Sequence, residues 1–144
     1  MRFMLMVKAT GYYEAGIDGG KELYAARAAF QDHMRAAGIL QSSEELLPSA
    51  SGIRVVFPPG GEAPAMLPGP FSPEQEWIAA YTVIDVETEE DALKWALRMP
   101  LPPGQGEHIV EVRRLASTVA DTALDARTKA LSADLQDHLS LLNS

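Results

Sequence analysis

Apolar residues recur along the chain in runs that predict β-strands, at residues 3–7, 51–57, 77–87 and 107–115. The segments 3–7 and 77–87 are apolar at almost every position. Strands of that pattern lie at the centre of a sheet, because both of their faces are buried. The run of proline and glycine at 58–61 ends the second strand and predicts a hairpin-like connection to an extended segment at 62–67.

Two other segments have the pattern of amphipathic helices. Residues 21–38 contain no internal glycine or proline and end at Gly38, a residue type that commonly stops a helix. At about 100° per residue, five apolar residues fall within one narrow arc of this helix and form its predicted buried stripe: Leu23, Ala26, Phe30, Met34 and Ala37. Thr88, followed by three acidic residues, predicts the N-cap of a second helix that ends before Pro100.

The residues after Gly38 add a short strand and a turn at 39–47, so the predicted order is β-α-β-β-(β)-α-β. That order predicts an α+β fold of the ferredoxin-like split βαβ type, with both helices on one face of an antiparallel sheet. Because the central strands are apolar on both faces, we expect a second copy of the chain to cover the other face in a homodimer. Residues 117–144, with a stripe of leucines, predict a C-terminal helical extension to a domain at 1–116.

Composition narrows the classes of function. The 144 residues carry 20 acidic and 12 basic side chains, a net charge of −8, which disfavours nucleic acids and anionic membranes as partners. The chain has no cysteine, which excludes disulfides and thiolate chemistry and fits a reducing cytoplasm. The three histidines lack metal-binding spacing, and the glycine pairs lack a phosphate-loop pattern, so we expect no metal and no cofactor.

Several stretches, in order, resemble one known family: MRFMLMV, AAGIL, SSEELLPS, the GPF of residues 69–71, YTVIDVET, EEDALKWALRMP and EVRRL. The chain is similar, over residues 1 to about 115, to the YCII-related proteins of the branch named for an Asp-Gly-Pro-Phe motif. This resemblance implies a small cytoplasmic protein that forms a dimeric α+β barrel and has no firmly established reaction. Pro68 stands where the motif has its Asp, whereas Gly69, Pro70, Phe71 and Glu76 are kept.

A candidate site surrounds the GPF loop, which we define as residues 69–71. Phe71 is either core or the wall of a pocket for a small organic molecule, and Trp77 and Tyr81 follow it on the central strand. Arg54, the charged residue of an apolar strand, pairs with Glu44 or Glu45 or binds a ligand carboxylate.

The sequence also contains a candidate proton-transfer pair. His33 lies about 20° outside the predicted buried stripe, at the edge of the helix–sheet interface, and the pKa of a histidine lies near neutrality. Glu76 precedes the central strand, where an apolar wall would raise its pKa. Each residue also has an ordinary structural interpretation, Glu76 as an exposed strand-entry residue and His33 as a structural residue of the helix.

Three hypotheses for function follow from these features. The first is a small-molecule-binding dimer with its pocket near the GPF loop, and the second is an enzyme that uses His33 and Glu76 for proton transfer. The third is a regulatory interaction module that docks through residues 117–144. The missing motif Asp lowers the weight of the enzymatic hypothesis.

Overall fold

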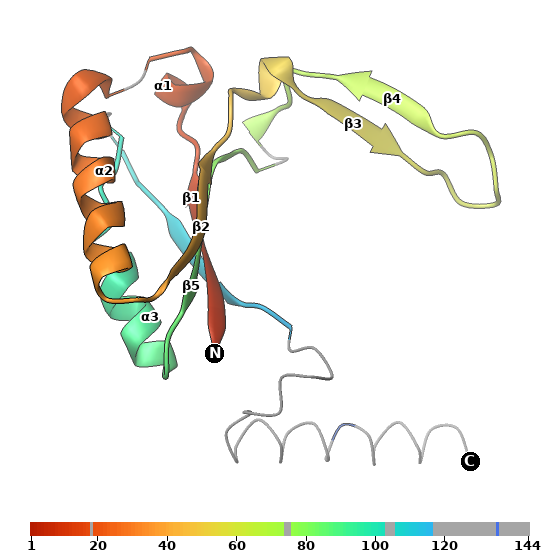
Figure 1. Cartoon of the computed structure of the whole chain (residues 1–144). Coiled ribbons are helices and arrows are strands. Elements are labelled where there is room, and N and C mark those ends of the chain that lie inside the picture. Colours follow the sequence, from red (N-terminus) through yellow and green to blue (C-terminus); the bar gives the residue numbers. More distant parts are fainter. Residues whose placement is uncertain (18, 74–75, 103–105, 117–134, 136–144) are drawn as a thin grey trace.

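The computed structural model (Figure 1) describes residues 1–17, 19–73, 76–102, 106–116 and 135. These residues form an α+β protein with antiparallel sheets. Its elements are, in chain order, β1 (Arg2–Lys8), α1 (Gly11–Glu14), α2 (Gly20–Ala36), β2 (Leu40–Glu45), the 3-10 turn η1 (Ser49–Ser51), β3 (Ile53–Val56), β4 (Ala65–Pro68), β5 (Ile78–Asp85), α3 (Glu89–Ala96) and β6 (Val110–Arg114). The predicted C-terminal extension lies outside the described residues, apart from Leu135.

The main sheet has the strand order β2-β5-β1-β6, and every neighbouring pair is antiparallel. The two runs that are apolar at almost every position, β1 and β5, occupy its centre, as the sequence predicts. Their register pairs Leu5 with Thr82 and Met6 with Tyr81. Because side chains alternate along a strand, Leu5 and Met6 lie on opposite faces of the sheet.

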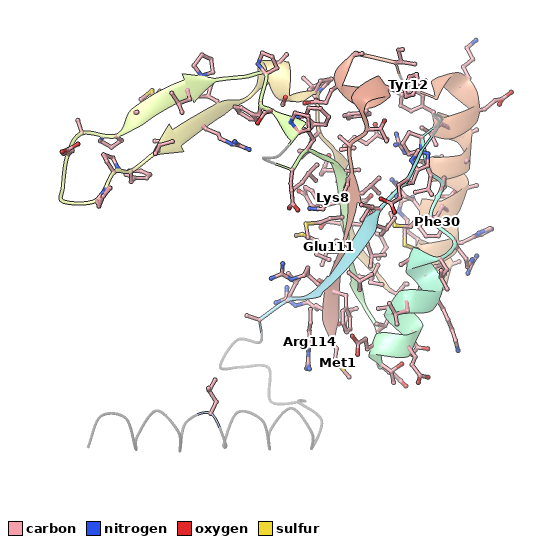
Figure 2. All side chains as sticks on the ribbon, turned by 180° about the vertical axis from the view of Figure 1, so that it is seen from behind. Met1, Lys8, Tyr12, Phe30, Glu111 and Arg114 are labelled. Atoms are coloured by element: carbon pink, nitrogen blue, oxygen red, sulfur yellow. The ribbon has the colours of Figure 1, made fainter. Side chains whose placement is uncertain are left out.

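Helices α2 and α3 cover one face of the main sheet (Figure 1). The core between the helices and the sheet contains Phe3, Leu5 and Ile84 from the strands and Phe30 and Met34 from α2. Figure 2 shows Phe30 on the helix side of the sheet and Lys8 toward the hairpin side.

The buried stripe of α2 differs from the predicted one. Leu23, Phe30 and Met34 are buried, but Ala26 and Ala37 are exposed. Ala37 follows the last residue of the helix and caps it. Near Ala26, the side of the helix that faces the sheet is occupied by longer polar side chains, described below.

The predicted helix ends are confirmed. Gly38 has a φ of +73°, and its N–H donates to the carbonyl of Arg35 at 2.9 Å, which closes α2 in the left-handed conformation that glycine adopts readily. Thr88 caps α3 and accepts a hydrogen bond from the backbone N–H of Asp91 at 3.1 Å. α1 was not predicted, because residues 11–14 carry no helical periodicity; Thr10 caps this short helix through the N–H of Tyr13.

Strands β3 and β4 form a hairpin that is separate from the main sheet and projects away from the body of the molecule (Figure 1). The hairpin itself was predicted, but its separation from the main sheet was not. Its apolar side chains are exposed on both faces, namely Ile53, Val55, Val56, Phe57, Met66 and Leu67. An isolated two-stranded sheet is at best marginally stable in water, and contiguous exposed apolar surface is uncommon on monomeric proteins.

Among the described helices, none is both long and apolar enough to cross a membrane.

Candidate functional site

The GPF loop packs against η1 through a set of short contacts. The N–H of Phe71 donates to Ser49 Oγ at 3.0 Å, and the N–H of Gly69 donates to the carbonyl of Gly52 at 2.8 Å. On the other side of η1, the Glu14 carboxylate accepts hydrogen bonds from the Ser49 N–H at 2.7 Å and from the Ser49 hydroxyl. These contacts hold η1 between α1 and the GPF loop.

The structure brings together three of the four predicted ligand-binding residues. The Arg54 guanidinium lies 4.2 Å from the centre of the half-buried Phe71 ring, and Trp77 Nε1 donates to the carbonyl of Phe71 at 2.8 Å. Tyr81 lies apart from them on β5, opposite Met6 of β1 and Glu44 of β2. Arg54 and Trp77 thus both contact Phe71. Such contacts between neighbouring segments are typical of a structural junction.

The predicted proton-transfer residues have different partners. His33 is exposed on α2, and its Nδ1 lies 3.5 Å from Arg98 Nη2. Glu76 is exposed, and its Oε2 lies 3.2 Å from Lys8 Nζ. Lys8 alternates with the buried residues of β1, so this ion pair lies on the sheet face opposite the helices. The structure therefore does not bring His33 and Glu76 together.

A cavity not foreseen from the sequence lies between α2 and the segment that follows β2. It has a volume of about 170 Å³, and we call it the outer pocket. Its wall is largely apolar and aromatic and includes Leu23, Tyr24, Leu46, Leu47, Pro48 and Pro102. Polar groups come from Tyr13, Arg27 and Glu45. A mainly apolar hollow with a few convergent polar groups is the usual form of a small-molecule site.

A second, smaller cavity of about 30 Å³ lies deeper, between α2 and the main sheet, and we call it the inner cavity. Phe30 and Met34 form part of its apolar wall, and Gln31, Ser43 and Thr82 supply polar groups. Both cavities are bordered by Arg27 and Glu45. These two residues therefore separate the outer pocket from the interior.

The Arg27–Glu45 pair is short and unequally buried. Arg27 Nη1 lies 2.7 Å from Glu45 Oε1, and the side chains of Arg27 and Glu45 are 15% and 40% exposed. Glu45 is the last residue of β2 and points to the helix-covered face, as does Ser43. The pair stands at the end of β2, where a side chain from α2 can reach it.

A second group of polar contacts borders the same inner cavity as this ion pair. Gln31 Nε2 donates to Ser43 Oγ at 3.3 Å, and Ser43 Oγ lies 3.0 Å from Thr82 Oγ1. Thr82 is only 3% exposed, so its hydroxyl depends on this neighbour for a hydrogen bond. Polar side chains from α2, β2 and β5 thus line the inner cavity at the helix–sheet interface.

Tyr13 fixes the wall of the outer pocket. Its hydroxyl donates to the carbonyl of Leu46 and lies 3.3 Å from the carbonyl oxygen of Ala79. Burial raises the pKa of the Tyr13 hydroxyl above its ordinary value, and the charge of Glu45 raises it further, while Arg27 acts in the opposite sense. The phenol therefore remains protonated, as its role as a donor requires.

This pKa shift predicts a loss of stability at high pH. The folded protein holds the Tyr13 proton more tightly than the unfolded chain, so the contribution is complete below about pH 10 and declines as pH rises beyond it. We expect Tyr13→Phe to cost about 1 kcal/mol at neutral pH, through the lost hydrogen bond, and to flatten the decline in Tm between about pH 9.5 and pH 11. Thermal unfolding at a series of pH values measures both effects. Tyr12→Phe, which removes an exposed phenol, should keep the wild-type profile.

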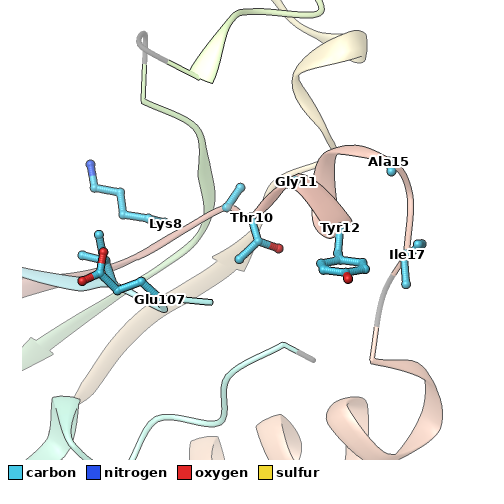
Figure 3. Close-up of a pocket in the computed structure, with 9 residues that line it drawn as sticks. Lys8, Thr10, Gly11, Tyr12, Ala15, Ile17 and Glu107 are labelled. Atoms are coloured by element: carbon cyan, nitrogen blue, oxygen red, sulfur yellow. The ribbon is translucent and has the colours of Figure 1, made fainter. Parts of the chain in front are cut away.

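A wider, more open cavity of about 560 Å³ lies beside α1 (Figure 3). Its lining includes Lys8, Thr10, Tyr12, Ile17 and Glu107. The positively charged Lys8 already has acidic partners: its Nζ lies 3.2 Å from Glu76 Oε2 and 4.0 Å from Glu111 Oε1. The outer pocket is smaller and better enclosed, and we take it as the stronger candidate site.

The sequence did carry a signal for this site. At about 100° per residue, Arg27 falls about 20° beyond Met34, at the edge of the arc formed by the buried residues Leu23, Phe30 and Met34. The predicted buried stripe contains apolar residues only and therefore leaves out Arg27. Within the part of the chain that the structure describes, no cluster of three or more histidine, aspartate or glutamate side chains could hold a metal ion.

No known protein family matches the chain, and no curated protein matches it.

Proposed function

We propose that this chain is a homodimeric protein of the YCII-related type that binds a small organic molecule in the outer pocket. One observation carries the proposal: an apolar pocket of about 170 Å³ has a short Arg27–Glu45 ion pair in its lining. Sites of this kind use the apolar wall for affinity and a few polar groups for orientation. A cytoplasmic location belongs to the same proposal and rests on the resemblance and on the absence of cysteine.

The strand order supports the ferredoxin-like part of this proposal. β1 and β2 are joined through α2, and β5 lies between them in the sheet, while α3 joins β5 to the other edge strand, β6. A split βαβ arrangement requires this order. The YCII-related assignment additionally rests on the sequence stretches given above.

The GPF loop has a supporting role in this proposal. It holds η1, and η1 directly follows residues 46–48 of the pocket wall. Substitution of Pro68 for the motif Asp is compatible with this role, because the hydrogen bonds to Ser49 and Gly52 come from backbone N–H groups of the loop. In this proposal, the predicted ligand residues Arg54, Phe71 and Trp77 support the wall of the outer pocket through η1. They do not line the pocket, so they would not contact the ligand.

The homodimer is supported by two surfaces on the same side of the chain. Met4, Met6 and Tyr81 lie half-buried on the sheet face that α2 and α3 leave uncovered. The apolar hairpin β3–β4 projects on that same side (Figure 1). A second copy can cover both surfaces in a symmetric contact, since each copy offers the same pair of surfaces.

The hairpin gives the dimer a direct test. Phe57 and Met66 are 75% and 74% exposed, and the double variant Phe57→Ser/Met66→Ser removes their apolar surface. We expect a homodimer in wild-type protein and a shift toward monomer in the variant, because apolar contact is the main drive for association. Sedimentation velocity measures the two species. Leu97→Ser, at an 87% exposed position just after α3, should leave the dimer intact. A wild-type chain that sediments as a monomer at all concentrations would reject the homodimer.

The binding proposal is tested with a screen of small aromatic and aliphatic fragments by thermal shift. Hits on wild-type protein should be lost on Tyr24→Ala, which opens the wall of the outer pocket. Tyr12→Ala is the matched control, since Tyr12 is similarly exposed but lines the wider cavity beside α1. Hits that disappear with Tyr12→Ala and persist with Tyr24→Ala would move the binding site to that other cavity.

A further inference from the structure

We infer that the outer pocket accepts a small apolar carboxylic acid, whose carboxylate replaces Glu45 as the partner of Arg27. This inference rests on the proposed function, because it names the class of ligand for the same pocket. It starts from one juxtaposition: Arg27 and Glu45 are shared by the outer pocket and the inner cavity, so the ion pair stands between them.

The two partners of this ion pair differ in their freedom to move. Glu45 is 40% exposed and ends an edge strand, so its carboxylate can turn into water and recover its hydration. The Arg27 side chain is only 15% exposed, so most of it would stay away from water if Glu45 turned outward. A buried guanidinium left without an anion is costly, and an incoming carboxylate removes that cost.

The chemistry of arginine favours this exchange. A guanidinium presents its N–H donors as a fork that fits both oxygens of one carboxylate. In the present structure the contact with Glu45 is a single one, from Nη1 to Oε1 at 2.7 Å. A ligand carboxylate in the outer pocket can bind the guanidinium through both of its oxygens. The apolar part of the ligand then contacts Leu23, Tyr24 and Leu47.

The volumes limit the size of the ligand. About 170 Å³ is close to the cavity of about 150 Å³ that accommodates benzene in a protein interior. The outer pocket therefore has room for one ring or a short branched chain. The inner cavity, at about 30 Å³, has room for a water molecule, and Gln31, Ser43 and Thr82 offer it hydrogen-bond partners.

A cationic ligand is the main competing possibility, since an amine would bind Glu45 in place of Arg27. The burial of Arg27 argues against it, because an amine that took Glu45 would leave the less exposed guanidinium without its anion. Among the described residues that line the outer pocket, Arg27 is the basic side chain and Glu45 the acidic one.

The test measures binding of benzoate, benzamide and benzylamine to the full chain by isothermal titration calorimetry, with wild-type protein and three variants. We expect benzoate to bind about tenfold or more tightly than benzamide to the wild type. Glu45→Gln should strengthen benzoate binding about threefold to tenfold, because it removes the internal competitor. Arg27→Gln should abolish the preference for benzoate. Glu44→Gln, the neighbouring carboxylate on the opposite face of β2, should leave every affinity unchanged.

The outcomes separate the two proposals. Equal binding of benzoate and benzamide, or tighter binding of benzylamine that Glu45→Gln abolishes, would overturn the carboxylate inference and leave the pocket as a binding site. Weaker benzoate binding by Glu45→Gln than by Glu44→Gln would also overturn it, even if Arg27→Gln failed to fold. If none of the three probes binds and the fragment screen also gives no hit that Tyr24→Ala removes, the proposed function itself fails.

Discussion

Replacement of Gly69 by alanine is expected to destabilise the protein by about 3 kcal/mol or more, which corresponds to a fall in Tm of roughly 10 °C. A Cβ atom at this position would lie 1.8 Å from the carbonyl oxygen of Ser49 and 2.7 Å from its carbonyl carbon. The obstructing atoms belong to the backbone of η1, so no side-chain rotation can relieve the clash. Either η1 or the GPF loop must move, and both the Gly69–Gly52 and the Phe71–Ser49 hydrogen bonds are then disturbed.

Gly11→Ala is the matched control for this substitution. A Cβ at Gly11 meets no atom within 4 Å, and the residue begins α1, where alanine is well tolerated. We expect its Tm to stay within about 2 °C of the wild type. Differential scanning calorimetry of the two variants separates a local steric effect from a general effect of the added methyl group. A Gly69→Ala protein as stable as Gly11→Ala would contradict the described packing of the GPF loop on η1.

Met34→Ala is expected to destabilise the protein by about 2–5 kcal/mol, the usual cost of truncating a large buried side chain. Met34 is fully buried, packs in the main core and forms part of the wall of the inner cavity. The substitution therefore enlarges an existing void as well as removing apolar contacts. Urea unfolding should give a lower midpoint with an unchanged slope, because the folded and unfolded states keep their relative compactness.

The adjacent Arg35→Ala serves as the control for Met34→Ala. Arg35 is 60% exposed and pairs with Asp32 on the surface of α2, so its loss should cost no more than about 0.5 kcal/mol. The contrast between the two neighbours tests which side of α2 faces the sheet. If Arg35→Ala were the more destabilising variant, the orientation of α2 described above would be wrong.

Local sequence patterns predicted the elements that local interactions determine. The continuous apolar runs of β1 and β5 placed them at the centre of the sheet, and Gly38 and Thr88 marked helix ends that the structure confirms. α1 escaped prediction because one turn of helix held by Thr10 has no periodicity to detect. The separation of the β3–β4 hairpin also escaped, because strand propensity does not state which sheet a strand joins.

The candidate site was harder to predict, because its members come from different elements. Arg27 and Glu45 are 18 residues apart, and their contact depends on how α2 packs on β2. The GPF motif predicted a ligand pocket at this loop, whereas in the structure Phe71 forms hydrogen bonds with Ser49 and Trp77. The predicted His33–Glu76 pair failed to meet because the helix phase turns His33 outward, beside Arg98.

The most direct test of the central claim is a ¹H–¹⁵N correlation spectrum of the labelled protein with and without the best fragment from the screen. If the fragment binds in the outer pocket, the largest shift changes should belong to the amides of Tyr13, Tyr24, Arg27, Leu46 and Leu47. The amides of Gly69 and Phe71 should change less, since the GPF loop packs on η1, away from the outer pocket. Changes confined to the GPF loop and Trp77, or to residues 8–12 of the wider cavity, would contradict the assignment of the outer pocket as the binding site.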